Sequence, residues 1–189
     1  MHLYNRAIEL LVILALIIIP SANTPSALET GATPIQSIFM IKQLIPQTQT
    51  IGLMWNQYET KTSELLPKIE RASVSNGVKV VVEDVESLKD ISQEFRELKD
   101  KYHVQVIWII ENNDPISSDV AREFLIKNSI VNGIALFAPS TDWVSAGACA
   151  SLLSDGSNVK LYVNRKTITA LRIIVPDKYL EDTKFVATN

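Results

Sequence analysis

The sequence predicts an α/β protein, a three-layer αβα domain with a mainly parallel sheet. Short apolar runs rich in β-branched residues, such as 50–55 and 104–110, alternate with segments of helical length. This alternation implies right-handed βαβ crossovers, because a helix must return the chain before the next parallel strand begins. The run at 104–110 lacks polar alternation, which is typical of a central strand covered by helices on both faces.

Length and composition are those of one globular domain. The chain has 189 residues, of which 47% are hydrophobic and 21% are charged. A chain of this length and composition can bury enough apolar surface to form a single core. A net charge of -3 at pH 7 argues against nucleic acid as a partner, since phosphate binding needs a basic face. The single cysteine, Cys149, lies among small residues, and we expect its thiol to be buried and unreactive.

The first 28 residues have the pattern of an export signal. Arg6 precedes an unbroken apolar run from Leu10 to Ile19, and a small-residue stretch with prolines follows at 20–27. The apolar run is shorter than the roughly 20 residues that span a bilayer. We therefore expect residues 1–28 to be a signal peptide of a periplasmic or secreted protein, and 29–189 to be one domain. An uncleaved N-terminal anchor is the alternative.

Helix and strand signals follow one another along residues 29–189. Thr33-Pro34 and Asp114-Pro115 each offer an N-cap before a proline, and Asn76-Gly77 is a helix stop. The turn signal SDGSN at 154–158 suits a hairpin. The expected helices cover about 34–45 (Ile35, Ile38, Phe39 and Ile45 inward), 63–75, 88–102, 115–128 (Ile116, Val120 and Phe124 inward) and 141–147; the expected strands are 50–55, 78–82, 104–110, 133–138, 148–153 and 159–163.

Four stretches of the chain carry a resemblance to known proteins. They are LIPQTQTIGLMWN (44–56), the strand 104–110 with Asp114-Pro115, APSTDWVSAGACASLLSD (138–155) and LYVNRKTITALRIIVPDKYLEDTKFV (161–186). These stretches resemble a family of bacterial ABC-transporter substrate-binding proteins that includes periplasmic tryptophan and tyrosine uptake components. The resemblance covers about residues 35–187 and implies the second lobe of a type I periplasmic binding protein, in which two α/β lobes close on a ligand. The first lobe is expected to be missing, and the turn at 154–158 stands where the family has a long helix.

The resemblance implies that polar loops after three strands face the ligand. The same loops are expected to lie together on physical grounds, because the carboxyl ends of parallel strands meet at one edge of a sheet, where ligands of open α/β sheets bind. Amide and hydroxyl side chains suit polar groups of a ligand, and Asp114 suits a ligand amino group. The candidate ligand-binding residues are Asn56, Gln57, Asn113, Asp114, Ser140, Thr141 and Trp143.

Each candidate also has a purely structural interpretation. Asp114 is equally suited to capping a helix that begins at Pro115, and Ser140 and Thr141 to capping the next helical turn. Asn56 is also a typical strand-terminating residue. Trp143 is as well suited to stacking on a ligand as to the core, whereas we expect Trp108, inside an apolar strand, to belong to the core.

Motifs for catalysis or metal binding are weak. His103 is the single histidine of the predicted mature domain, and it precedes the central strand, at the opposite edge of the sheet from the candidate loops. Cys149, His103 and Glu111 are scattered, and the glycines form neither GxGxxG nor a P-loop. Glu83 and Asp84 are expected in a solvated loop. We therefore expect a non-enzymatic protein without metal or cofactor.

Two functions remain open at this level. The first is an exported binding or sensing domain for a small organic ligand such as an amino acid, related to transport. The second is an interaction module of the cell envelope that needs no ligand. The expected protein partners are an ABC permease or another envelope protein, and a second copy of the chain in a homodimer.

Overall fold

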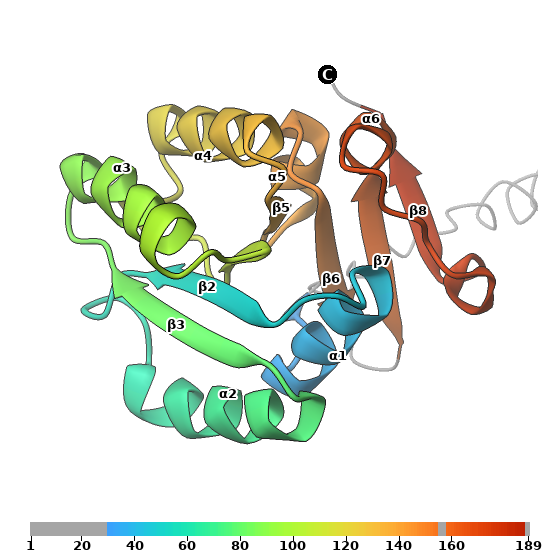
Figure 1. Ribbon diagram of the computed structural model, residues 1–189, viewed down its shortest axis with the longest axis horizontal. Coiled ribbons are helices and arrows are strands. Elements are labelled where there is room, and N and C mark those ends of the chain that lie inside the picture. The colour runs from blue at the N-terminus through green and yellow to red at the C-terminus, as the bar shows by residue number, and fades with distance from the viewer. Residues whose placement is uncertain (1–29, 155–157, 188–189) are drawn as a thin grey trace, which may run out of the picture.

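The structure, a computed structural model, describes residues 30–154 and 158–187 and confirms the predicted three-layer α/β fold (Figure 1). Residues 1–28, for which an export signal is predicted, lie outside the described residues, as do 155–157 in the predicted hairpin turn. Among the described residues, no helix is long and apolar enough to span a bilayer.

One sheet contains the eight strands of the described residues, in the order β3-β2-β4-β5-β6-β7-β8, with β1 paired to β6. Neighbouring strands are parallel except at two places: β6 pairs antiparallel with β7 and with β1. The β6–β7 pairing confirms the two strands expected beside the turn signal. The strands are β1 Thr30–Gly31, β2 Thr50–Trp55, β3 Lys79–Asp84, β4 Val106–Ile109, β5 Ala135–Phe137, β6 Ala150–Ser154, β7 Val159–Asn164 and β8 Thr183–Val186.

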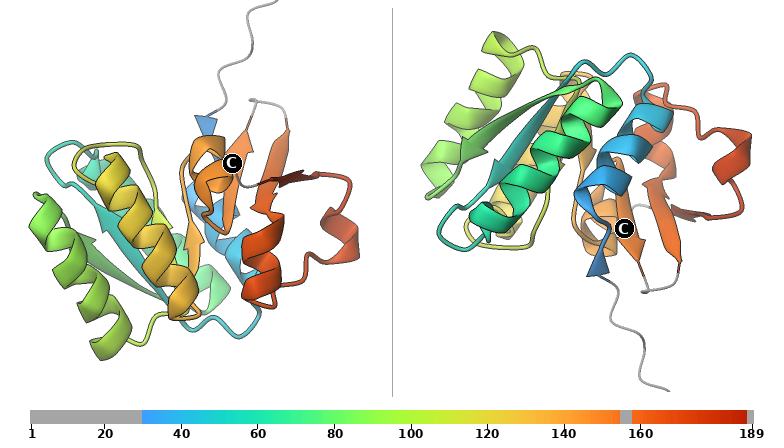
Figure 2. Two further views of the ribbon diagram at one scale, coloured as in Figure 1. Left: turned by 90° about the horizontal axis from the view of Figure 1, so that it is seen from above. Right: turned by 90° about the horizontal axis from the view of Figure 1, so that it is seen from below.

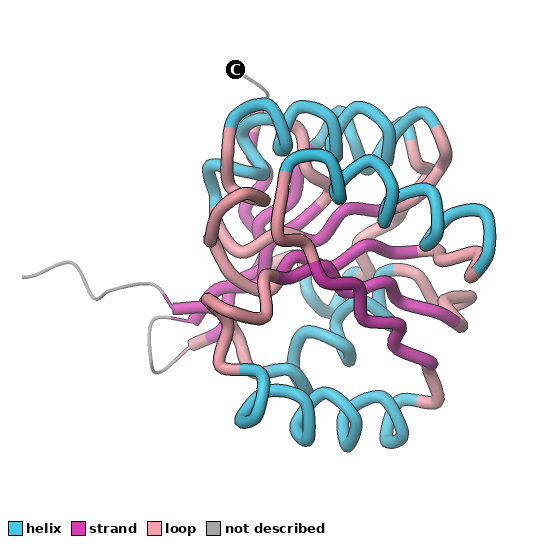
Figure 3. Tube along the Cα trace, turned by 90° about the vertical axis from the view of Figure 1, so that its left-hand side faces the viewer, coloured by secondary structure: helices cyan, strands magenta, loops and turns pink. Residues whose placement is uncertain are grey.

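Helices cover both faces of this sheet, which Figure 3 shows between two helical layers. Helices α1 and α2 lie on one face, whereas α3, α4 and α5 lie on the other (Figures 1 and 2). A π-helical turn, η1, continues α3, and a short 3-10 turn, η2, precedes β8. The helices are α1 Pro34–Leu44, α2 Thr62–Asn76, α3 Leu88–Arg96, η1 Glu97–Lys101, α4 Asp119–Val131, α5 Thr141–Ala146, α6 Arg165–Ala170 and η2 Asp177–Tyr179.

Two large apolar cores and a small third one fill the space between the layers. Residues of β4 alternate between them: Trp108 packs toward α1 and α2, and Ile107 and Ile109 pack toward α3 and α4. The central strand is therefore buried on both faces, as its unbroken apolar run predicted. Trp108 and Cys149 belong to the first core and are 5% and 1% exposed, which confirms the expectation that both are buried.

The inner face of α1 differs from the expected one. Ile38 and Ile41 are fully buried, whereas Ile35 and Phe39 are 47% and 44% exposed. The reason is how α1 packs: α2 lies beside it (Figure 2, right), and the side of α1 that faces the core contains Ile38 and Ile41.

Helix α4 begins later than the Asp114-Pro115 pair predicts. The Asp114–Pro115 peptide is cis, residues 114–117 form a turn, and Ser118 is the N-cap, with its Oγ accepting from the Ala121 N–H at 3.4 Å. Ile116 is fully buried as expected, but Val120 is 68% exposed because the helix starts in a different register.

The end of β3 also corrects the sequence-based expectation. Glu83 and Asp84 are the last two residues of the strand and are half-buried, not part of a solvated loop. The predicted stop at Asn76-Gly77 is confirmed, since Gly77 adopts the left-handed conformation with φ of 61° at the end of α2. Strand β8 had no counterpart among the expected strands.

Candidate functional site

Three loops meet at the carboxyl edge of the parallel strands. Strand β4 lies between β2 and β5, with Met54 beside Ile109 and Trp108 beside Phe137. The chain leaves all three strands at the same edge, so the loops beginning at Asn56, Ile110 and Ala138 are neighbours. All the predicted site residues except Trp143, which follows on α5, lie in these loops or at the first residue of α5.

Asn56 joins the first two loops. Its Nδ2 donates to the main-chain oxygen of Asp114 at 2.8 Å, and its Oδ1 accepts from the Tyr58 N–H at 3.0 Å. The residue is 9% exposed. Both ends of the amide are therefore occupied within the protein, and Asn56 holds the loops together.

Asn113 lies in a second connection between the same loops. Its Nδ2 donates to Thr60 Oγ1 at 3.1 Å and approaches Glu111 Oε2 at 3.4 Å. Its Oδ1 is buried and accepts no hydrogen bond among the described residues. A buried acceptor without a partner costs about 1–3 kcal/mol, so this oxygen favours any rearrangement that brings it a donor.

Asp114 is exposed and holds the turn that precedes α4. One carboxylate oxygen, Oδ1, accepts from Ser117 Oγ at 2.9 Å, while Oδ2 has no hydrogen bond among residues that the structure describes. Asp114 is therefore not the N-cap of α4. Its second oxygen is available to a donor from solvent or from a ligand.

Gln57 links this edge to β3 through its backbone. Its N–H donates to Asp84 Oδ1 at 2.8 Å, and its side chain is exposed. The neighbouring Glu83 has its pKa raised to about 7, first by burial and then by hydrogen bonding and repulsion from Glu94 on α3. Asp84 thus fixes the loop, and Glu83 contacts the helical layer.

The third loop contributes Ser140, Thr141 and Trp143. Ser140 is the N-cap of α5 with extended backbone, Thr141 is the first helical residue, and both are half-buried. Trp143 is 1% exposed, and its indole N–H donates to Asn112 Oδ1 at 2.8 Å. The ring is thus part of the core, and this hydrogen bond ties the third loop to the second.

Sequence reasoning missed three residues of this network. Thr60, Glu111 and Asn112 were not named as candidates, although each lies in a loop that was. The run of polar residues at 111–114 was the available signal. Ligand contact by any of the seven predicted residues stays a prediction.

The residues considered for catalysis or metal binding, His103 and Cys149 among them, do not come together among the described residues. His103 is exposed and precedes β4, so it lies at the amino end of this strand, whereas the candidate loops lie at the carboxyl end. Burial raises the pKa of the Cys149 thiol to about 12, so it is not a nucleophile at neutral pH. Within residues 30–154 and 158–187, no three His, Cys, Asp or Glu side chains form a group able to hold a metal ion.

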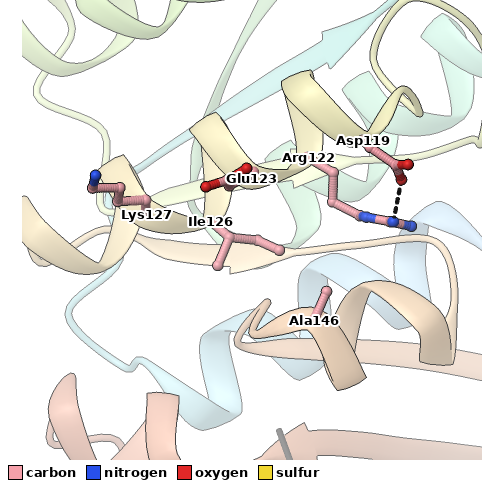
Figure 4. A pocket seen from close by; sticks show the side chains of 6 residues that line it. All are labelled: Asp119, Arg122, Glu123, Ile126, Lys127 and Ala146. Atoms are coloured by element: carbon pink, nitrogen blue, oxygen red, sulfur yellow. Dashed lines mark hydrogen bonds and ion pairs between the residues drawn. The ribbon is translucent and has the colours of Figure 1, made fainter. Parts of the chain in front are cut away.

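Two hollows near the sheet differ in size and lining. One of about 410 Å³ lies between α4 and α5, where the guanidinium of Arg122 is paired with Asp119 (Figure 4). At the edge itself, a hollow between β4, β5 and the start of α1 measures about 20 Å³, room for about one water molecule. None of the seven candidate residues lines either hollow, so the candidate site is described as a polar surface.

A parallel α/β domain with a polar carboxyl edge fits a ligand-binding lobe. The sequence profile of a family described as ABC transporter substrate binding protein matches residues 8–159, and the chain belongs to this family. Among curated proteins there is no match.

Three solved structures share the fold. An ABC domain in complex with L-Trp from Streptococcus pneumoniae has 19% identity and a TM-score of 0.69, over 82% of this chain and 61% of that one. A ligand-free, open substrate-binding protein with adhesive properties from Clostridium difficile has 18% identity and a TM-score of 0.70, over 85% and 61%. A conserved domain protein from Vibrio cholerae has 18% identity and a TM-score of 0.69, over 82% and 61%. The chain therefore spans less than two thirds of these relatives.

Proposed function

We propose that this domain binds a small organic molecule with a protonated amino group, such as an amino acid, at the carboxyl edge of its sheet. The observation that carries the proposal is the network of Asn56, Asn113 and Trp143, which fixes three polar loops side by side. Loops held in this way lose little entropy when a ligand binds. The family membership and the L-Trp complex of one structural neighbour support the same ligand class.

Within this surface, Asp114 is the proposed partner of the amino group. It is exposed, and its Oδ2 is unoccupied among the described residues. Asn113 Oδ1, buried and without a donor, is the second proposed acceptor once the loop adjusts to a ligand. The predicted signal at residues 1–28 supports a location outside the cytoplasm, where an ABC permease is the corresponding partner.

A thermal-melt screen of the purified chain against amino acids and small amines tests this proposal. A ligand at about 100 times its dissociation constant adds roughly 2.7 kcal/mol and raises Tm by several degrees. Asp114→Ala should weaken binding about tenfold or more, whereas Asp177→Ala, which removes an exposed carboxylate far from this edge, should leave it unchanged. A chain that melts cooperatively with no shift from any amine or amino acid contradicts the proposal.

A second candidate function is protein interaction through the same edge. Tyr58, Leu88 and Val120 are 75%, 50% and 68% exposed, and they lie in the loops or first helical turns that follow β2, β3 and β4. Exposed apolar side chains gathered at one edge are typical of an interface. If this function is right, light scattering will show self-association that Tyr58→Ser and Val120→Ser abolish, independently of any ligand.

A further inference from the structure

A separate apolar groove lies on the outer side of the α1–α2 layer. It measures about 210 Å³ and is lined by Thr33, Pro34 and Ile35 of α1 and its cap, and by Lys68, Arg71 and Ala72 of α2. Ile35 and Phe39, one turn apart on α1, are both nearly half exposed and extend the apolar surface. The two helices lie side by side over this face (Figure 2, right).

The two positive side chains at this groove form no ion pair among the described residues. Lys68 and Arg71 are both exposed, and within the described residues no carboxylate lies within 4.0 Å of either. Arg71 donates only through Nε, to the Pro67 carbonyl at 3.1 Å, so its two terminal nitrogens are available. The groove also adjoins the positive end of α1, whose first turn contains no acidic residue.

From this geometry we infer a second binding site, for a small apolar carboxylate. The apolar body lies between Ile35 and Ala72, and the carboxylate accepts hydrogen bonds from Lys68 and the free terminal nitrogens of Arg71. The volume is below the roughly 300 Å³ at which pockets for drug-sized ligands begin, so the ligand has one ring or a short chain.

This site is independent of the carboxyl-edge proposal and selects the opposite charge. The groove offers two cations and an apolar floor, whereas the edge offers Asp114 and the oxygen of Asn113. A carboxylate without an amino group therefore fits the groove, and an amine fits the edge. Failure of one proposal leaves the other standing.

An NMR titration of the ¹⁵N-labelled full chain with sodium phenylacetate tests the inference. The expected result is a set of saturable shifts in amides of α1 and α2, with weaker binding of the neutral phenylacetamide. The double variant Lys68→Ala/Arg71→Ala should lose at least tenfold in affinity. Its matched control is Lys89→Ala/Arg96→Ala on α3, where Arg96 makes the same bond to the carbonyl four residues earlier, at 3.1 Å, on the opposite face of the sheet.

Three outcomes of the titration would overturn the inference. These are the absence of saturable shifts at millimolar phenylacetate, equal affinity for phenylacetamide, and equal losses in the two double variants. Cosedimentation with phosphatidylglycerol vesicles, in the absence of phenylacetate binding, would instead assign the groove to a membrane surface and also overturn it.

Discussion

Asn56→Ala tests whether the carboxyl edge is held by internal hydrogen bonds. The substitution removes the bonds to the Asp114 carbonyl and from the Tyr58 N–H. Each bond contributes about 0.5–1.5 kcal/mol, so we expect a loss of about 2 kcal/mol. For a chain of this size that corresponds to a fall in Tm of roughly 4–8 °C.

Two further variants make the Asn56 experiment specific. Gln57→Ala removes an exposed side chain whose only described bond is through the backbone N–H, so it should cost less than about 0.5 kcal/mol. Asn56→Asp keeps the acceptor for Tyr58 but sets a carboxylate against the Asp114 carbonyl, so it should recover stability at low pH, where the carboxyl becomes a donor. The bridging role is refuted if the Tm values of Asn56→Ala and Gln57→Ala agree within a degree or two and urea unfolding gives them the same free energy of unfolding.

Three further predictions concern groups whose environment the structure defines. Burial, followed by hydrogen bonding and repulsion from Glu94, raises the pKa of Glu83 to about 7, so this group lowers stability as pH rises from about 4.5 to 7. Glu83→Gln should match the wild type at pH 4.5 and exceed it by roughly 1 kcal/mol at pH 8, after allowance for solvent screening. An equal advantage at both pH values contradicts the raised pKa. Cys149 should not react with a disulfide reagent at pH 8 in the folded chain and should titrate as one thiol in guanidinium; fast reaction without denaturant would show that it is accessible. Gly52→Val should lower stability by about 1–3 kcal/mol in denaturant unfolding, because a Cβ at this position lies 2.7 Å from a methyl of the fully buried Leu98; a neutral effect would mean that Leu98 has room to move.

Most of the fold was predictable because its signals are local. Strand β2 has the bounds that its apolar run predicts, Thr50–Trp55, and Gly77 ends α2 where the helix stop was expected. The outer face of α1 was not predictable, because Ile35 and Phe39 have apolar side chains and their exposure depends on where α2 packs. The periodicity of one helix cannot reveal which side its neighbour occupies.

The predicted start of α4 was wrong for a different reason. Asp114 and Ser118 both offer N-cap side chains, and the proline after Asp114 made the first choice attractive. Ile116 lies fully buried in the turn between them, and this burial is a tertiary contact that no cap signal contains. Asp114 therefore lies in an exposed turn and does not cap the helix, and one of its carboxylate oxygens is available.

The convergence of the site loops was predictable, but their mutual bonds were not. Parallel strands bring their carboxyl ends together whatever the side chains, so Asn56, Asn113 and Ser140 were expected at one edge. Asn56 donates a hydrogen bond to the Asp114 carbonyl, and the Trp143 indole donates one to Asn112. The partners in these bonds are about 30 to 60 residues apart in the chain, so the bonds depend on how distant loops fold. The sequence therefore indicated the surface without separating its supporting residues from its available ones.

Ligand binding and association are coupled if the edge is one wall of a cleft. An open surface cannot cover the 70–90% of a small ligand that pockets usually bury, so a single copy offers an amine few contacts beyond Asp114. A second surface, brought to the edge by the exposed Tyr58 and Val120, would complete the enclosure. Linkage then requires that ligand strengthens association and that association strengthens ligand binding by the same factor. Ligand affinity that rises with protein concentration would indicate that the two candidate functions are one, whereas affinity independent of concentration would assign the site to a single copy.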